Sequence, residues 1–322
     1  MDRKDFRIVF MGTPEFATGS LKALVENGYN IAGVVTVPDK PAGRGQKLIE
    51  SDVKKYAVSK QIPVLQPEKL KSEDFLNQLR ALKPDLQVVV AFRMLPEVVW
   101  SLPTHGTFNL HASLLPQYRG AAPVNRAVMN GEKKSGVTTF FIDEKIDTGE
   151  IIQQKAVSIT DDMNAGELHD LLMETGAELV IETVQSIIDG TVKTQPQGSY
   201  FSDETELKSA PKIFRDDCKI DWDQQGHKIY NHIRGLSPYP AAWTQLRFDD
   251  ESKNTSAKIY KSVFQPDTQS KPGQLVTDNK TYLKIGCRDG WISIKEIQLA
   301  GKKRMPVEDL LRGYHFEHAV AE

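Results

Sequence analysis

The chain has 322 residues, a length that favours two domains over one. Its composition, with 39% hydrophobic and 26% charged residues, excludes a fibrous or disordered chain, and no apolar run is long enough to cross a membrane. The formal net charge of -2 gives no global signal for nucleic acid. The polar first residues lead directly into an apolar run at residues 8–10, which leaves no room for a secretion signal, so we expect a cytoplasmic protein.

Residues 7–10 predict a strand, and residues 16–25 carry apolar side chains at helical spacing. We expect Thr13 to cap this helix, Pro14 to occupy its first helical position and Gly28 to end it. The dinucleotide-binding pattern Gly-x-Gly-x-x-Gly is absent from this turn.

Residues 38–48 follow a second buried strand at residues 31–37 and contain two prolines and two glycines, which predicts a loop without an element of its own. Lys40, Arg44 and Lys47 lie in this loop, where they could fold onto phosphates. A solvated loop whose charges serve solubility is the alternative.

Strands and helices continue to alternate through residues 53–92, which is typical of a mostly parallel sheet with helices on both faces. Ligands of such sheets gather at the carboxyl ends of the strands. Phe92 and Leu95 lie at one such end, and residues 107–111 form the next predicted strand. Both ends should therefore face one crevice.

The second half of the chain changes character. A long apolar stripe at residues 165–188 predicts a helix that closes a first domain at residues 1–190, and residues 191–210 are polar and irregular, as in a linker. Residues 211–322 alternate short strands with turns, which indicates a small β-barrel or sandwich. Residues 209–322 carry 18 Lys and Arg against 15 Asp and Glu, a weak asymmetry consistent with a polyanionic partner.

No metal site is expected. Cys218 and Cys287 are the only cysteines, and neither lies in a cluster with metal-ligand spacing, so we interpret both as free thiols.

Asn109, His111 and Asp147 form the candidate catalytic set. In an extended strand Asn109 and His111 project from the same face, and Asp147 follows a later strand in a loop. Asn can donate to a developing oxyanion, His can move a proton, and a carboxylate can orient the ring, so the set suits acyl transfer without a covalent step. Each residue alone could instead be an ordinary structural polar group. A second alternative makes Ser113 a nucleophile, although no Gly-x-Ser-x-Gly elbow is present.

The chain resembles the methionyl-tRNA formyltransferase family, within the folate-dependent formyltransferases, over nearly its whole length. The Asn-x-His and Asp set marks the wider group, and the loop and the carboxyl-terminal part narrow the assignment. The matching segments are Phe10-Met11-Gly12-Thr13-Pro14-Glu15-Phe16, Pro38-Asp39, Gly43-Arg44-Gly45, Asn109-Leu110-His111-Ala112-Ser113-Leu114-Leu115-Pro116, Tyr118-Arg119-Gly120-Ala121-Ala122-Pro123, Asp147-Thr148-Gly149, Ile220-Asp221-Trp222, Pro238-Tyr239-Pro240-Ala241-Ala242-Trp243 and Gly301-Lys302-Lys303.

The resemblance implies an α/β architecture: a Rossmann-like formyltransferase domain that binds 10-formyltetrahydrofolate, and a carboxyl-terminal barrel, similar to an OB fold, that binds initiator methionyl-tRNA. Asn109 and His111 would polarise the formyl oxygen, and Asp147 would orient His111 and help to remove the amine proton. The implied folate-site residues are Ser113, Leu114, Leu115, Pro116, Phe92 and Leu95, the first four as its lining and the last two through backbone. The resemblance implies tRNA contacts at Arg44, Lys302 and Lys303, and the loop cations Lys40 and Lys47 are further candidates from their charge.

One position departs from the family pattern. Arg93 stands where the family commonly has the glycine of an aromatic-Gly pair, beside the expected pterin pocket, and we expect its side chain to point outward. Other folate-dependent reactions stay open at this point. An amino-sugar formyltransferase shares the Ser-Leu-Leu-Pro run and a barrel-like tail, and a formyl-folate hydrolase would use water in place of the amine. A glycinamide ribonucleotide formyltransferase would normally lack the chain beyond residue 190, and a catalytically silent RNA-binding protein would not need the intact catalytic set. A monomer is expected.

Overall fold

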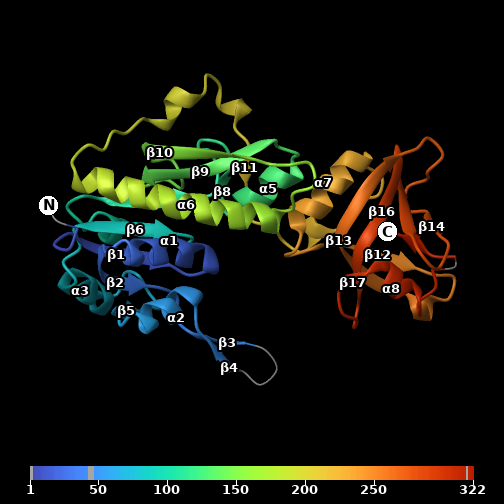
Figure 1. Ribbon diagram of the computed structural model, residues 1–322, viewed down its shortest axis with the longest axis horizontal. Coiled ribbons are helices and arrows are strands. Elements are labelled where there is room, and N and C mark those ends of the chain that lie inside the picture. The colour runs from blue at the N-terminus through green and yellow to red at the C-terminus, as the bar shows by residue number, and fades with distance from the viewer. Residues whose placement is uncertain (1–2, 43–46, 317) are drawn as a thin grey trace. The chain divides into compact units, whose positions relative to one another are not determined.

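The fold is described from a computed structural model, for residues 3–42, 47–316 and 318–322 (Figure 1). The chain forms two compact units. Unit 1 contains Met1–Gly120, Ser135–Val157 and His169–Ala210, and unit 2 contains Ala121–Lys134, Ser158–Leu168 and Pro211–Glu322. No helix among the described residues has the length and apolar character that a membrane span requires.

Unit 1 is built on a seven-stranded sheet in the order β10-β9-β7-β6-β1-β2-β5. The neighbours from β7 to β5 pair in parallel, whereas β9 is antiparallel to β7. The sheet is therefore mixed and mostly parallel, as the alternating pattern predicted. Its strands are β1 (Arg7–Gly12), β2 (Asn30–Val35), β5 (Val64–Leu65), β6 (Leu86–Val90), β7 (Thr107–His111), β9 (Lys134–Phe141) and β10 (Ile151–Ser158).

Helices cover this sheet because its central strands are apolar on both faces. Val9 and Met11 of β1 pack in one core cluster with Phe75 and Leu79 of α3, while α1 lies against β1, β2 and β6. The helices outside unit 2 are α1 (Glu15–Glu26), α2 (Asp52–Ser59), α3 (Glu73–Ala81), α4 (Glu97–Trp100) and most of α6 (Ala165–Ile188). Layered packing of this kind leaves the carboxyl ends of the parallel strands free to carry a site.

The start of α1 corrects one prediction. The helix begins at Glu15 with the extended residue Pro14 at its N-cap, and the Thr13 hydroxyl, which is buried, has no hydrogen-bond partner among the described residues. Thr13 therefore does not cap α1, and the prediction that Pro14 occupies the first helical position is also wrong, because Pro14 is the N-cap one residue earlier. The expected exit is confirmed, since Gly28 adopts a φ of 77° just after the helix, a conformation that glycine reaches without strain.

The segment expected as a structureless loop contains a short hairpin. Strands β3 (Lys40–Ala42) and β4 (Lys47–Ile49) pair antiparallel, with Pro41 opposite Leu48. Proline is tolerated there because a two-stranded ribbon consists of edges only, where a missing N–H costs no interior ladder bond. Arg44 lies outside the described residues.

Unit 2 contains a seven-stranded antiparallel sheet in the order β14-β15-β16-β13-β12-β18, with β17 beside β16. A bridge between Gln274 and Val320 joins the two ends, so the sheet closes almost into a barrel. This confirms the expected small barrel. Its strands are β12 (Ala242–Arg247), β13 (Thr255–Pro266), β14 (Leu275–Thr277), β15 (Leu283–Cys287), β16 (Gly290–Leu299), β17 (Met305–Pro306) and β18 (Val320–Ala321).

The barrel core comes from alternating side chains, with Ile285, Ile292, Ile294 and Leu299 among its buried members. Cys218 and Cys287 are buried free thiols, as predicted, and burial raises the pKa of both. Among the described residues, the α-helices that lie wholly in unit 2 are α5 (Pro123–Met129), α7 (Gly226–Leu236) and α8 (Val307–Leu311), and the first residues of α6 also belong to it.

Two segments that precede residue 190, Ala121–Lys134 and Ser158–Leu168, belong to unit 2. The buried Arg234 of α7 donates from Nη1 to the carbonyl of Met163 at 2.7 Å, and Asn125 of α5 donates to the carbonyl of Gly235 at 2.8 Å. The division into domains at residues 1–190 and 211–322, with a linker at residues 191–210, stays a prediction. The remaining short elements are β8 (Arg119–Gly120), β11 (Ser209–Ala210), η1 (Gln197–Tyr200), η2 (Glu204–Glu206), η3 (Asp216–Cys218) and η4 (Glu251–Lys253).

Candidate active site

His111 ends strand β7, at the carboxyl edge of the parallel part of the sheet, and is 6% exposed. Its Nε2 lies 2.9 Å from the carbonyl oxygen of Tyr118. Because a carbonyl can only accept, Nε2 carries the hydrogen, and in the neutral ring Nδ1 is left as the acceptor. Nδ1 lies 3.8 Å from Oδ2 of Asp147. The nitrogen available for proton transfer is thus the one beside the carboxylate.

Asp147 reaches His111 from the loop after β9. Its backbone has a φ of 55°, which is uncommon for a residue other than glycine, and its Oδ2 accepts from the amide of Gly120 at 2.9 Å. Two residues later, a Cβ on Gly149 would lie 1.7 Å from the carbonyl oxygen of Phe141. Only glycine fits there, so the loop lies in close contact with β9. This contact helps to fix the Asp147 carboxylate beside His111.

Asn109 lies two residues before His111 on β7 and is half-buried. Alternation along the strand puts both side chains on one face of the sheet. Within the part of the chain that the structure describes, no hydrogen bond involves the side-chain amide of Asn109. It is the member of the catalytic set whose donors are free for a ligand.

The turn after His111, residues 113–116, is fixed by hydrogen bonds between its backbone and side chains of β9 and β10. Thr138 Oγ1 donates to the carbonyl of Ser113 at 2.6 Å and accepts from the amide of Leu115 at 3.1 Å. Gln154 donates to the Leu115 carbonyl at 2.8 Å. Ser113, Leu115 and Pro116 are buried and Leu114 is half-buried, so a ligand would meet this turn mainly through backbone.

The alternative that makes Ser113 a nucleophile does not fit this arrangement. Its hydroxyl donates to the carbonyl of Gln117 at 2.6 Å, and His111 directs Nε2 to Tyr118. A general base must reach the proton that it removes. Neither ring nitrogen is paired with the serine, which leaves the non-covalent interpretation.

Phe92 and Leu95 lie in the turn after β6. Leu95 is 7% exposed and belongs to the core beneath the sheet, and the half-buried Phe92 packs against the same cluster. Both side chains are therefore used in packing, and the backbone of the turn is what it can offer to a ligand.

Arg93, in the same turn, does not extend into solvent. Its Nη1 donates to the Glu68 carbonyl at 3.0 Å and its Nη2 to the Pro67 carbonyl, and partial burial lowers its pKa. The guanidinium thus binds the loop after β5, where it stabilises the backbone.

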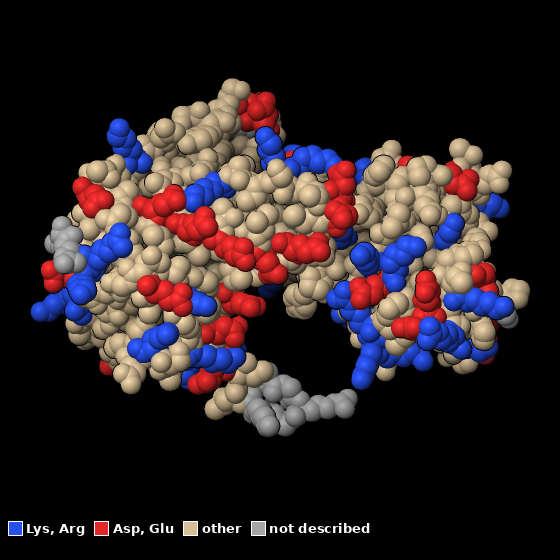
Figure 2. All heavy atoms as spheres, in the orientation of Figure 1, with Lys and Arg blue, Asp and Glu red and all other residues tan. Residues whose placement is uncertain are grey.

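The described residues among the predicted tRNA contacts belong to both units, Lys40 and Lys47 to unit 1 and Lys302 and Lys303 to unit 2. Lys40 is exposed on β3, and Lys302 and Lys303 are exposed after β16, with Lys302 Nζ 5.9 Å from the centre of the Tyr314 ring. Lys47 lies on β4, and the position of Arg44 is not described. In contrast, a row of acidic side chains follows α6, formed by its exposed residues Glu167, Asp170, Glu174, Glu178 and Glu182 (Figure 2). That row is unsuited to a polyanion.

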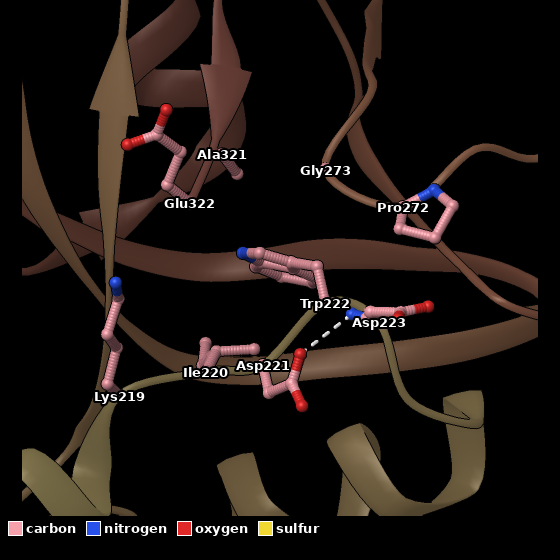
Figure 3. Close-up of a pocket in the computed structure, with 9 residues that line it drawn as sticks. All are labelled: Lys219, Ile220, Asp221, Trp222, Asp223, Pro272, Gly273, Ala321 and Glu322. Atoms are coloured by element: carbon pink, nitrogen blue, oxygen red, sulfur yellow. Dashed lines mark hydrogen bonds between the residues drawn. The ribbon is translucent and has the colours of Figure 1, made fainter.

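A cavity of about 440 Å³ in unit 2 does not belong to this site (Figure 3). Asp221, Asp223 and Glu322 contribute carboxylates to its lining, and only Lys219 contributes a cation. Asp223 is paired with Arg288 at 2.9 Å. A lining of this kind repels phosphate, and none of its residues belongs to the candidate catalytic, folate or tRNA set.

Two protein-family profiles match the chain. The profile described as "Formyl transferase" matches residues 6–184, and "Formyl transferase, C-terminal domain" matches residues 212–315. The methionyl-tRNA formyltransferase of Parabacteroides distasonis is 55% identical over 98% of this chain and 97% of its own length. That of Phocaeicola vulgatus is 57% identical over 98% and 97%.

The chain belongs to the methionyl-tRNA formyltransferase family. Solved structures of more distant relatives share the formyltransferase fold. WlaRD, a sugar 3N-formyl transferase, is 23% identical with a TM-score of 0.62, over 92% of this chain and 99% of its own. The N-formyltransferase of Helicobacter canadensis is 22% identical with a TM-score of 0.62, over 93% and 100%. The catalytic roles of Asn109, His111 and Asp147 stay a prediction within this family.

Sequence reasoning missed several residues of the formyltransferase site. Tyr118 and Gly120 lie in the family segment at residues 118–123. They bind His111 and Asp147 through backbone atoms, and the type of a residue does not predict a backbone contact. Gln197 bonds the backbone at Asp147 and Gly149, with 2.9 Å to each carbonyl. It comes from the polar segment that we predicted as a linker, and a single glutamine in such a segment gives no signal.

No three His, Cys, Asp or Glu side chains come together as metal ligands anywhere in the described ranges. Formyl transfer without a metal stays a prediction of the residue chemistry.

Proposed function

We propose that this protein transfers the formyl group of 10-formyltetrahydrofolate to the α-amino group of methionine on initiator methionyl-tRNA, giving N-formylmethionyl-tRNA for translation initiation. The observation that carries the proposal is near-full-length identity above 50% with methionyl-tRNA formyltransferases, on a chain that keeps His111 Nδ1 and Asp147 Oδ2 3.8 Å apart. The reaction forms one amide bond and breaks another. The amine loses a proton, and folate N10 gains one.

His111 and Asp147 supply the proton transfer in this proposal. With Nε2–H engaged by Tyr118, Nδ1 accepts the proton of the attacking amine, and the adjacent carboxylate favours the imidazolium that forms. The same Nδ1–H can then protonate the departing folate nitrogen. Gly120 keeps the carboxylate in place throughout, because its amide donates to Asp147 Oδ2.

Asn109 stabilises the oxyanion in this proposal. Its side-chain amide has no partner among the described residues, so one of its N–H groups can donate to the formyl oxygen as negative charge develops there. His111, once protonated, adds a positive charge on the same face of the sheet. Both contributions are larger in the transition state than in the ground state.

The folate cosubstrate would meet the backbone of two turns. Residues 113–116 are fixed by Thr138, and the turn from Phe92 to Leu95 follows the exposed residue Ala91, which has a φ of 47°. Backbone N–H and C=O groups in rigid turns are suited to a pterin ring, whose edge carries donors and acceptors. Arg44, Lys40, Lys47, Lys302 and Lys303 are proposed as phosphate contacts for the tRNA, on the basis of the family motif and their charge.

A competition assay tests the proposed acceptor. Purified protein receives 10-formyltetrahydrofolate together with methionine-charged initiator tRNA and an amino-sugar nucleotide, and formyl incorporation into each is followed. We expect the tRNA to be formylated. Incorporation into the sugar alone would refute the assignment, and release of formate without either product would indicate a hydrolase. Cytoplasmic location and a monomeric state stay predictions.

A further inference from the structure

Gln197 is a buried polar residue whose side chain has all of its hydrogen-bonding capacity in use. It is 3% exposed. Its Nε2 donates to the carbonyls of Asp147 and Gly149, both at 2.9 Å, and its Oε1 accepts from Arg119 Nε at 3.1 Å and Nη2 at 2.7 Å. Arginine can only donate and carbonyls can only accept, so the amide has one possible orientation.

These contacts lie on the backbone that presents the candidate carboxylate. Asp147 has a φ of 55°, a conformation that costs free energy for residues other than glycine and persists where surrounding contacts enforce it. Gln197 binds the carbonyl of that same residue. The two N–H groups of Nε2 are the contacts through which Gln197 restrains the backbone at Asp147 and Gly149.

The Arg119 end of the network reaches the other partner of the catalytic pair. Arg119 lies between Tyr118, whose carbonyl accepts from His111, and Gly120, whose amide donates to Asp147. The amide of Tyr118 in turn donates to the carbonyl of Lys208 at 2.6 Å, and β8 pairs with β11. The stretch from Gln197 to Ala210, predicted as a linker, therefore binds both sides of the His111–Asp147 pair.

We propose that Gln197 is a positioning residue for formyl transfer, which acts by holding the Asp147 carboxylate beside Nδ1 of His111. This inference rests on the proposed catalytic role of Asp147. Gln197 does not touch the reacting atoms. It sets the geometry of a group that does, and a disturbance of that geometry should lower kcat while leaving both Michaelis constants nearly unchanged.

Two variants and one control separate positioning from folding. Gln197→Leu removes the amide at similar volume, and Gln197→Glu keeps a partner for Arg119 but removes both donors to the loop. The backbone bridge between Gln195 and Ile151 does not involve the Gln197 side chain and keeps η1 in place. Tyr200→Phe, in the same short helix, removes a bond from an exposed hydroxyl to Gln195 and is the matched control.

We expect kcat to fall by roughly tenfold or more in both Gln197 variants, with Michaelis constants for tRNA and folate within about twofold, since a positioning residue acts in the transition state. Tyr200→Phe should behave like the unchanged protein. Hydrogen exchange should show faster exchange for amides of residues 143–149 in the Gln197 variants only. In an Asp147→Asn background, Gln197→Leu should produce little further reduction, because residues that act as one unit are not additive.

Each outcome decides a different claim. Normal kcat and unchanged exchange in Gln197→Leu, beside an inactive Asp147→Asn, would overturn the positioning role and leave the proposed function standing. A full additional reduction in the Asp147→Asn background would also overturn it. If the unchanged protein failed to formylate methionyl-tRNA, the proposed function would be refuted, and hydrogen exchange at residues 143–149 would still decide whether Gln197 holds the loop.

Discussion

The segment at residues 142–150, which carries Asp147 and is called the catalytic loop below, lies in unit 1, as does the β3–β4 hairpin. The two are held in opposite ways. Asp147 is fixed by hydrogen bonds to its side chain and its backbone. The hairpin exposes 66% of Leu48 and 54% of Ile49 and is anchored at its base, where Asp39 accepts from Gln66 at 2.8 Å and pairs with Lys54. Fixed groups suit a reaction that needs one geometry, and an exposed ribbon suits a large partner that supplies its own contacts.

The pairing at the base of the hairpin is electrostatic as well. Hydrogen bonding from Lys54 lowers the pKa of Asp39 below its ordinary value. A depressed carboxyl pKa favours the paired state above the pKa of the unfolded chain, and that contribution disappears as the pH falls through the lower, folded value. The anchor is therefore complete at neutral pH.

Removal of a catalytic side chain should give the largest effect. We expect Asn109→Ala and His111→Ala each to lower turnover by about a hundredfold or more, the scale of losing an oxyanion donor. Steady-state formylation of methionyl-tRNA measures this, with thermal melting as a check on folding. Near-normal turnover in a folded variant would show that the residue is structural and not catalytic.

Gly149→Ala tests the rigidity of the catalytic loop. The added Cβ would meet the Phe141 carbonyl oxygen at 1.7 Å, so the loop must move. We expect turnover to fall by roughly tenfold or more, because small displacements of a reacting group are costly. Gly198→Ala is the control, since a Cβ there has nothing within 4 Å. Equal behaviour of the two variants would contradict a tightly held loop.

Arg44→Ala tests the hairpin side of the comparison. We expect the Michaelis constant for tRNA to rise by about three- to tenfold, the effect of removing one charged group from the interface, while the constant for folate stays unchanged. Initial rates at varied tRNA and varied folate distinguish the two constants. Equal changes in both would show that Arg44 does not act on tRNA alone.

Lys302→Ala and Lys303→Ala should have the smallest effects. Each removes one exposed cation, so we expect tRNA binding to weaken severalfold at low salt. The slope of log affinity against log salt should decrease by about one for each phosphate that the variant no longer neutralises. Fluorescence titration at several salt concentrations measures this. An unchanged slope would show that these lysines do not neutralise phosphates of the tRNA.

The predictability of the two regions also differs. Asn109, His111 and Asp147 are candidates from the sequence alone because their types suit acyl transfer and because they lie at the end of a strand or in the loop after one. Their catalytic role stays a prediction. The sheet and the barrel followed from hydrophobic periodicity. The partners of these residues could not be found, since Tyr118 and Gly120 act through backbone and Gln197 is fifty residues further along the chain than Asp147.

Local rules were less reliable where tertiary packing competes with them. Thr13 has the type of an N-cap, yet α1 begins at Glu15 and leaves its hydroxyl unbonded among the described residues. The two prolines and two glycines of residues 38–48 indicate a loop, yet the ends of that segment pair as β3 and β4. Propensity weighs each residue by itself, whereas strand pairing depends on what lies opposite.

The pairing of β8 with β11 has a practical consequence for dissection of the protein. A protein truncated at residue 190 would retain Asn109, His111 and Asp147 but would lack Gln197 and the strand Ser209–Ala210. Such a fragment would contain the three candidate catalytic residues but not the side chain that we propose aligns them. A cut after Ala210 would keep Gln197 and β11, but it would separate Asn125 and Met163 from their hydrogen-bond partners in α7. Neither cut therefore divides the chain into its two compact units.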